Sequence, residues 1–181
     1  MQDEVPGKVF AGFLKELHGI PLSILEGIMQ CDSTDMYSEI NSLYSKLKEH
    51  VYPFMRNEAR KEISTSFELY LNECSHFNFT PSLVPGDFGM TNILYVATKR
   101  DISGVIDFGG AGIRDPAYDL AWILASYGEE FLQLFSSHYP NLEAVKKRMY
   151  FYKSTFALQK ALFGVLNNDK IAFEAGIEQY V

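Results

Sequence analysis

The sequence predicts an α+β fold that is mainly α-helical and contains one small β-hairpin. Two observations lead to this fold class. Apolar residues recur at helical spacing over several long segments, both before and after the middle of the chain. Between them lies a short stretch, residues 93–106, in which branched and aromatic residues flank a polar turn. We therefore expect about five to seven helices around this hairpin.

Three helices are expected before the hairpin. In the first, Phe10, Leu14 and Leu17 fall on one face, and Pro21 ends the pattern. The next two helices carry apolar and aromatic stripes that are more typical of a core than of a ligand site. The expected ranges are 6–20, 36–54 and 57–74.

The hairpin brings two polar residues together. Residues 93–96 form the expected first strand, residues 98–103 the turn and residues 104–106 the returning strand. Asn92 directly precedes the first strand, and Asp107 directly follows the second. Because paired antiparallel strands lie side by side, Asn92 and Asp107 are expected at the same end of the hairpin.

A third polar side chain belongs to the loop before the hairpin. Asp87 lies five residues before Asn92, and Gly86 and Gly89 allow tight turns around it. Mg²⁺ prefers oxygen ligands and is often held by one or two carboxylates together with substrate phosphates. The pattern D-x-x-x-x-N followed by D-F-G at Asp107 has the order that kinases use for phosphoryl transfer.

Helices resume after the hairpin. Asp115 followed by Pro116 is a helix start signal, and Asp119 lies one turn inside an otherwise apolar segment. Asp119 is expected either to be buried with partners or to face solvent. Three further helices are expected over residues 128–138, 141–166 and 169–180.

The chain resembles the aminoglycoside phosphotransferases and related small-molecule kinases. The resemblance rests on PGDFGMTNIL, GVIDFGGAGIRDPAYDLA and the upstream FLKELH, and covers the chain from about Phe10 to its end. It implies the C-terminal lobe of a protein-kinase-like fold, with the hairpin carrying the catalytic and metal loops. It also implies a cytoplasmic, ATP-binding transferase linked to antibiotic resistance.

The resemblance assigns a role to each motif residue. Asp87 would be the catalytic base and contact the substrate, while Asn92 and Asp107 would bind Mg²⁺ and, through it, ATP or GTP. Asp119 would support the Asp87 loop by bonding to its backbone.

The acceptor implied is a small molecule with a hydroxyl group, first of all an aminoglycoside. Such cationic substrates need acidic side chains, and Glu129 and Glu130 are the expected substrate-binding pair. Glu174 and Glu178 are further candidates, although solvated helix-surface carboxylates are the simpler interpretation of both. A sugar, an amino alcohol or a macrolide remains an alternative acceptor.

Two departures from the family pattern leave an alternative open. No Gly-rich strand pair or V-A-x-K lysine precedes Pro85, so the chain is expected to lack the N-terminal nucleotide-covering lobe. Pro85 also replaces the family's histidine. A degenerate lobe that binds a ligand or partner without phosphoryl transfer is therefore the second hypothesis. The surface that would meet an N-terminal lobe is expected to favour self-association.

Composition restricts the remaining possibilities. The 181 residues fit one domain, residues 1–181, and 47% hydrophobic residues suffice for a core. The net charge of −7 argues against a nucleic-acid partner, and no apolar run is long enough for a membrane span. Cys31 and Cys74 are interpreted as incidental reduced thiols, and His18, His50 and His76 as structural residues without zinc-ligand spacing.

Overall fold

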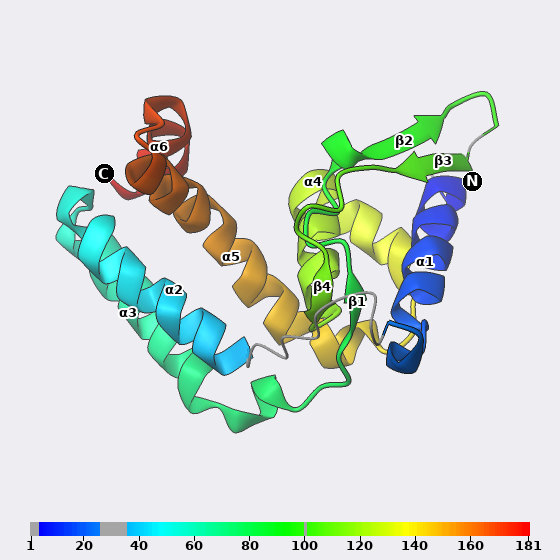
Figure 1. Cartoon of the computed structure of the whole chain (residues 1–181), viewed down its shortest axis with the longest axis horizontal. Coiled ribbons are helices and arrows are strands. Elements are labelled where there is room, and N and C mark those ends of the chain that lie inside the picture. Colours follow the sequence, from blue (N-terminus) through cyan, green and yellow to red (C-terminus); the bar gives the residue numbers. More distant parts are fainter. Residues whose placement is uncertain (1–3, 26–35, 100) are drawn as a thin grey trace. The chain divides into compact units, whose positions relative to one another are not determined.

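The computed structural model describes residues 4–25, 36–99 and 101–181. Internal contacts divide the chain into two compact units. Unit 1 comprises residues 1–33 and 80–153, and unit 2 comprises residues 34–79 and 154–181. The long helix α5, Leu142–Asn167, contributes its first part to unit 1 and the rest to unit 2 (Figure 1). The single domain expected over residues 1–181 stays a prediction.

Unit 1 is built on two helices, α1 (Glu4–His18) and α4 (Ala117–Ser136), which pack together. Aromatic rings fill the space around the fully buried Phe88. Phe10 meets Phe88 edge-on at 6.2 Å, and Phe13 stacks on it at 5.6 Å. Phe88 is the residue after Asp87, so this core anchors the loop that carries the predicted site.

Two small antiparallel sheets complete unit 1. β2 (Ile93–Val96) pairs with β3 (Asp101–Val105), and Ile93 lies opposite Val105. This is the predicted hairpin. The second sheet, which was not predicted, pairs β1 (Ser82–Val84) with β4 (Gly112–Arg114). It joins the two ends of the segment that contains both predicted loops.

The expected limits of the hairpin turn were wrong. The polar run 98–103 was assigned to the turn, but residues 101–103 lie in β3 and the described turn covers residues 97–99. Ile106 was expected to end the returning strand, but it lies outside β3. Asp101 and Ser103 are exposed, so the strand accommodates polar side chains, and the Ser103 hydroxyl donates to the Leu94 carbonyl at 3.1 Å.

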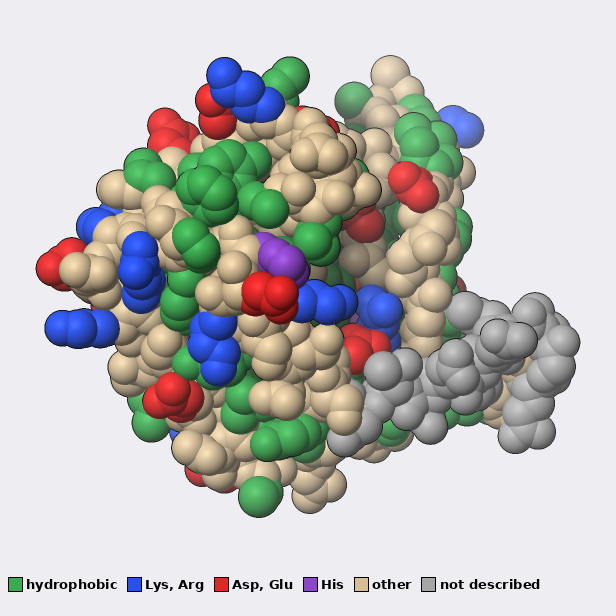
Figure 2. Space-filling view, turned by 60° about the vertical axis from the view of Figure 1, so that its left-hand side comes forward, with side chains coloured by type: hydrophobic (Ala, Val, Ile, Leu, Met, Phe, Trp, Pro, Cys, Tyr) green, Lys and Arg blue, Asp and Glu red, His purple; other side chains and the backbone are tan. Residues whose placement is uncertain are grey.

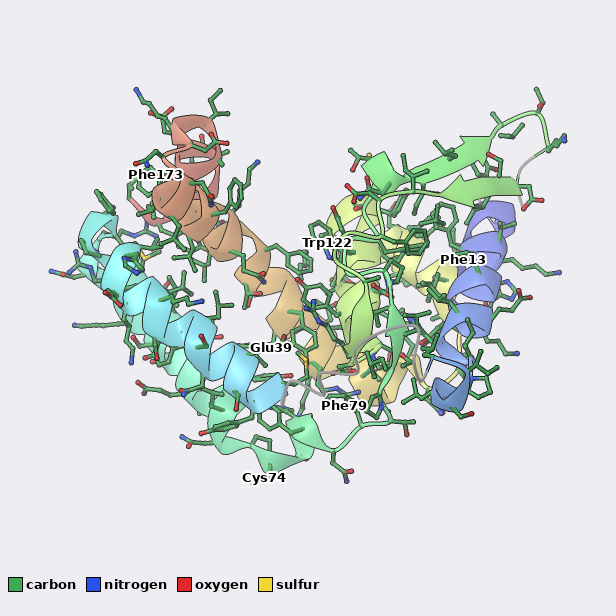
Figure 3. All side chains as sticks on the ribbon, viewed as in Figure 1. Phe13, Glu39, Cys74, Phe79, Trp122 and Phe173 are labelled. Atoms are coloured by element: carbon green, nitrogen blue, oxygen red, sulfur yellow. The ribbon has the colours of Figure 1, made fainter. Side chains whose placement is uncertain are left out.

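Unit 2 is helical. α2 (Met36–His50) and α3 (Asn57–Asn72) pack side by side, with the Tyr44 and Phe67 rings stacked at 5.0 Å. α6 (Lys170–Ile177) follows α5, and Phe173 packs edge-on against Phe54 at 5.0 Å (Figure 3). Short 3₁₀ helices cover Tyr52–Phe54, Cys74–Phe77 and Glu178–Tyr180 in this unit, and Leu22–Ile24 and Met90–Asn92 in unit 1.

α4 is kinked at Gly128, whose φ of 79° and ψ of −178° are non-helical. A new helical segment was predicted to open at this glycine, and the break lies there. Because the left-handed half of φ space is easily reached only without a Cβ, glycine suits this position. The kink separates the stretch that contains Asp119 from the stretch that contains Glu129 and Glu130.

The surface carries charges of both signs. In the face shown in Figure 2, acidic and basic side chains alternate with small apolar areas. None of the described helices is both long and apolar enough to cross a membrane.

Candidate active site

The loop between β1 and β2 starts with a backbone turn at Gly86. Its φ is +83°, and a Cβ at this position would lie 2.1 Å from the Gly110 carbonyl oxygen. Gly110 belongs to the segment that follows Asp107. The two predicted loops therefore touch through their backbones, and only glycine permits this approach.

Asn92 connects the two ends of the Asp87 loop. Its side-chain Nδ2 donates to the Asp87 carbonyl oxygen at 3.1 Å, and its backbone amide donates to the Gly89 carbonyl at 3.0 Å. Asn92 is only 8% exposed. Because the amide nitrogen is used in the loop, Oδ1 is the atom of this side chain that can accept a bond or coordinate a cation.

Asp107 lies at the hairpin end beside Asn92, as expected. The backbone amide of Ile106 donates to the Asn92 carbonyl at 2.9 Å, which fixes Asp107 one residue further on. Asp107 is exposed and has a φ of 61°, and its Oδ1 accepts from the Gly109 amide at 3.3 Å. This local bond is one that Asp can form in the left-handed conformation.

The donor set suits a hard cation shared with a nucleotide. Among the described residues, no group of three or more His, Cys, Asp and Glu side chains could hold a metal ion alone. Mg²⁺ needs fewer protein ligands, since one or two carboxylates plus phosphates and waters complete its shell. Asn92 Oδ1 and the Asp107 carboxylate are oxygen donors of this kind, on two segments joined by the Ile106 bond.

Asp119 is buried, with 0% exposure, which decides between the two readings of its sequence position. Its Oδ2 lies 2.9 Å from His18 Nε2, and the Gly86 backbone amide is close enough to lower the pKa of the carboxyl. Burial nevertheless dominates and raises the pKa of Asp119 above its ordinary value. A carboxyl beside Gly86 fits the expected support of the Asp87 loop.

Sequence reasoning missed Trp122 as a second support. Its Nε1 donates to the Gly86 carbonyl oxygen at 3.1 Å (Figure 3). The available signal was the spacing, because Asp119 and Trp122 are three residues apart and share a face of α4. Trp122 therefore holds the Gly86 peptide by a hydrogen bond, and Asp119 lies beside the same peptide.

Asp115 fixes the start of α4. It is fully buried, and its Oδ1 accepts from the Ala117 amide at 3.0 Å, in agreement with the predicted helix start. Arg148 Nε donates to its Oδ2 at 2.6 Å, and the Tyr152 hydroxyl donates to the same oxygen at 3.0 Å. A buried carboxylate needs such partners to offset its desolvation.

The expected substrate-binding acids lie beyond the kink of α4, and both are exposed. Glu129 accepts a 2.5 Å hydrogen bond from the Tyr150 hydroxyl of α5, and this bond raises the pKa of Tyr150 to about 12. No hydrogen bond joins Glu130 to another residue in the described part of the chain. The structure thus keeps the pair on the surface of unit 1 and ties Glu129 to α5.

The remaining candidates lie elsewhere. Glu174 and Glu178 are exposed in unit 2, and Glu174 lies 3.5 Å from Lys170 Nζ. His76 stacks on Tyr70 with ring centroids 4.3 Å apart. Cys74 is an exposed free thiol, and Cys31 lies outside the described residues.

The sequence model of the phosphotransferase enzyme family (APH) matches residues 8–148. The chain belongs to this family. A viomycin phosphotransferase from Streptomyces vinaceus is 32% identical over 137 residues, which cover 74% of this chain and 47% of that protein. The chain therefore spans about half the length of this curated relative.

Solved structures of phosphotransferases have the same fold. An aminoglycoside 2'-phosphotransferase-IIIa in complex with GDP is 23% identical, with a TM-score of 0.86 over 98% of this chain and 60% of that chain. A macrolide 2'-phosphotransferase type I is 22% identical, with a TM-score of 0.75 over all of this chain and 60% of that one. The prediction of a mainly helical, kinase-like fold is confirmed.

Proposed function

We propose that the chain carries the catalytic and metal-binding loops of an ATP- or GTP-dependent phosphotransferase that acts on a hydroxyl group of a small molecule. The observation that carries this proposal is the linkage of the backbone segments that present Asp87, Asn92 and Asp107. Asn92 bonds to the Asp87 carbonyl through its amide and to Ile106, next to Asp107, through its backbone. Family membership supports the same reaction class.

Each of the three side chains has a role in the proposed reaction. The Asp87 carboxylate orients the acceptor hydroxyl and takes its proton as the oxygen attacks the terminal phosphorus of the nucleotide, whose bond to the bridging oxygen breaks so that the nucleoside diphosphate leaves. Asn92 Oδ1 and Asp107 would hold Mg²⁺. The ion, when bound, neutralises charge that develops on the phosphates. Most of the rate enhancement in this chemistry comes from such positioning and charge stabilisation.

An aminoglycoside is the first acceptor to test. Relatives named for viomycin, aminoglycosides and macrolides all match the chain, and one aminoglycoside phosphotransferase was solved with GDP and kanamycin. The net charge of −7 and the exposed Glu129 and Glu130 are compatible with a polycationic acceptor. A macrolide offers fewer cationic groups, so the effect of these two acids separates the two acceptor classes.

The test is phosphate transfer followed by ³¹P NMR, with ATP or GTP, Mg²⁺, and kanamycin, viomycin or a macrolide in turn. Asp87→Asn should lower the rate by about a factor of 10² to 10⁴, the usual contribution of a general base. Glu130→Gln should weaken the use of kanamycin more than the use of a macrolide. Glu49→Gln, an exposed carboxylate of α2, is the matched control and should leave the rate unchanged.

A second candidate function, binding without transfer, is favoured by Pro85. This residue is buried at the start of the loop and offers no N–H donor in the position of the family's histidine. Calorimetric titration with Mg²⁺-nucleotide and aminoglycoside distinguishes the two candidates. Binding that is lost in Asp107→Ala, without product formation, would favour the binding module. A folded chain that binds neither ligand would contradict both.

A further inference from the structure

The backbone on both sides of Asp87 is held by hydrogen bonds. Trp122 Nε1 donates to the carbonyl oxygen of Gly86 at 3.1 Å, and Asn92 Nδ2 donates to the carbonyl oxygen of Asp87 itself at 3.1 Å. The Asp87 side chain has no such support, because within the described part of the chain no hydrogen bond or ion pair reaches its carboxylate. Its direction must therefore be set by the space around it.

Gly89 borders this space. A Cβ at position 89 would lie 3.2 Å from Asp87 Oδ1, which is closer than ordinary van der Waals contact. The same Cβ would lie 3.6 Å from Cε3 and 3.8 Å from Cζ3 of the Trp122 ring, in ordinary contact (Figure 3). Position 89 thus adjoins both the carboxylate of Asp87 and the indole of Trp122, and a side chain there would compete with the carboxylate for room.

The backbone conformation does not explain why position 89 is a glycine. Gly89 has a φ of −79° and a ψ of 161°, which is extended backbone that any residue adopts. The tight turn expected around Asp87 lies at Gly86 instead, where φ is +83°. What distinguishes glycine at position 89 is therefore its lack of a side chain next to Asp87.

We propose that Gly89 is a positioning residue for Asp87: because it has no side chain, the carboxylate can lie against the loop beside the indole of Trp122. The proposal rests on the proposed function, in which Asp87 accepts the proton of the acceptor hydroxyl. Gly89 has no side chain to contact nucleotide or acceptor in this assignment and acts only through Asp87.

The test replaces Gly89 by two residues of increasing size. In Gly89→Ala, the Asp87 oxygen must give way by a few tenths of an ångström, and in Gly89→Val the branched side chain fills more of the space between carboxylate and indole. Both residues accept an extended backbone. Gly104→Ala is the matched control, because its Cβ would meet Leu94 Cδ1 at an ordinary 3.7 Å.

The first measurement needs no turnover. Three-bond NMR couplings of the Asp87 Cγ to the backbone nitrogen and carbonyl carbon report the χ1 rotamer of this side chain. Wild type and Gly104→Ala should share one rotamer, and Gly89→Val should move most molecules to another. Wild-type couplings in Gly89→Val would overturn the proposal.

A double variant tests the part of the indole. Trp122→Leu removes the ring, so the valine of Gly89→Val has room on that side and should displace Asp87 less than it does beside the intact indole. Such non-additivity is expected for neighbouring side chains that share one space. An equal rotamer shift with and without the indole would overturn the role assigned to Trp122 here.

Kinetics and stability separate positioning from folding. If the wild-type chain transfers phosphate, Gly89→Ala should lower kcat about 4- to 10-fold and Gly89→Val about 10²-fold, since a misplacement of about 1 Å can cost about 10²-fold. The KM for nucleotide and the urea midpoint should not fall below those of Gly104→Ala, because alanine at a compatible φ does not destabilise the fold. An unchanged kcat in Gly89→Val, or a loss of kcat that only follows a loss of stability, would contradict positioning.

Failure of this proposal can be told apart from failure of the proposed function. If the wild-type chain transfers no phosphate to any acceptor, the proposed function fails. The NMR couplings then still decide whether Gly89 directs the Asp87 carboxylate, since they are measured on the chain alone.

Discussion

At the scale of single residues, the site depends on two unusual backbone conformations. Gly86 has a φ of +83° and lies against Gly110, and Asp107 has a φ of 61° and bonds to the Gly109 amide. The first closes the Asp87 loop onto the following segment. The second turns the Asp107 carboxylate at the hairpin end, where Asn92 lies. Left-handed residues at such loops are often retained because they place functional groups.

The Gly86→Ala variant tests this closure. A Cβ 2.1 Å from the Gly110 oxygen cannot be accommodated, so the two loops must separate, at a cost of about 1–3 kcal/mol for strain of this kind. We expect a lower free energy of unfolding in urea and weaker binding of Mn²⁺-nucleotide by calorimetry. Gly112→Ala is the control, because its Cβ would meet Arg114 Nε at an ordinary 3.6 Å. Equal losses in the two variants would contradict the assignment.

At the scale of elements, small residues allow helices α5 and α6 to approach closely. A Cβ on Gly164 would lie 2.3 Å from the Phe173 amide nitrogen, and one on Gly176 would lie 2.3 Å from the Ala161 nitrogen. In both cases the obstacle is backbone, which cannot move aside as a flexible side chain can. The close approach of α5 and α6 in unit 2 therefore requires glycine, which has no side chain, at positions 164 and 176.

Two helical glycines should respond in opposite directions to replacement by alanine. Gly176→Ala should lower the free energy of unfolding by about 1–3 kcal/mol through overpacking. Gly12→Ala in α1 should raise it by about 0.5–1 kcal/mol, because nothing lies within 4 Å of its added Cβ and alanine favours the helix. Urea unfolding monitored by circular dichroism measures both. A Gly176→Ala variant as stable as the wild type would show that α5 and α6 separate at little cost.

At the scale of the whole molecule, the residues proposed for catalysis, metal binding and loop support all belong to unit 1. The exposed apolar side chains of Leu94, Ile106 and Phe108 lie in or directly after its hairpin, and self-association through such a surface stays a prediction. The unit also buries the Asp119 carboxyl completely. That burial makes stability depend on pH.

The sign of this dependence follows from the raised pKa of Asp119. The folded state binds the Asp119 proton more tightly than the unfolded state does, so protonation of Asp119 stabilises the fold. This stabilisation is fully present below the ordinary Asp pKa of about 3.9, and it is lost as the pH rises through the pKa of the folded state. The difference in unfolding free energy between wild type and Asp119→Asn should fall with rising pH, by at most about 1.4 kcal/mol per pH unit. Urea titrations across this range measure it, and a constant difference would refute the raised pKa.

Much of the fold and of the candidate site could be predicted from the sequence, because the sequence patterns that indicate them are local. The helical periods gave the helices to within a few residues, and the Gly128 break and the Asp115 start lie where expected. The pairing of β1 with β4 was missed, since strands of three residues show no clear alternation. The polar residues of β3 were assigned to the turn because polar residues are typical of turns. An exposed strand can also carry polar side chains, so the pattern did not distinguish the two.

The sequence by itself determined the motifs, their order and the placement of Asn92 and Asp107 at one hairpin end, because short loops and neighbouring strands leave the chain few alternatives. Only the tertiary structure decided that Asp119 is buried, that His18 meets it across 101 residues and that Arg148 meets Asp115 across 33. Such partners are selected by the packing of distant helices. Packing depends on which faces meet in space, and neither composition nor spacing along the chain specifies that.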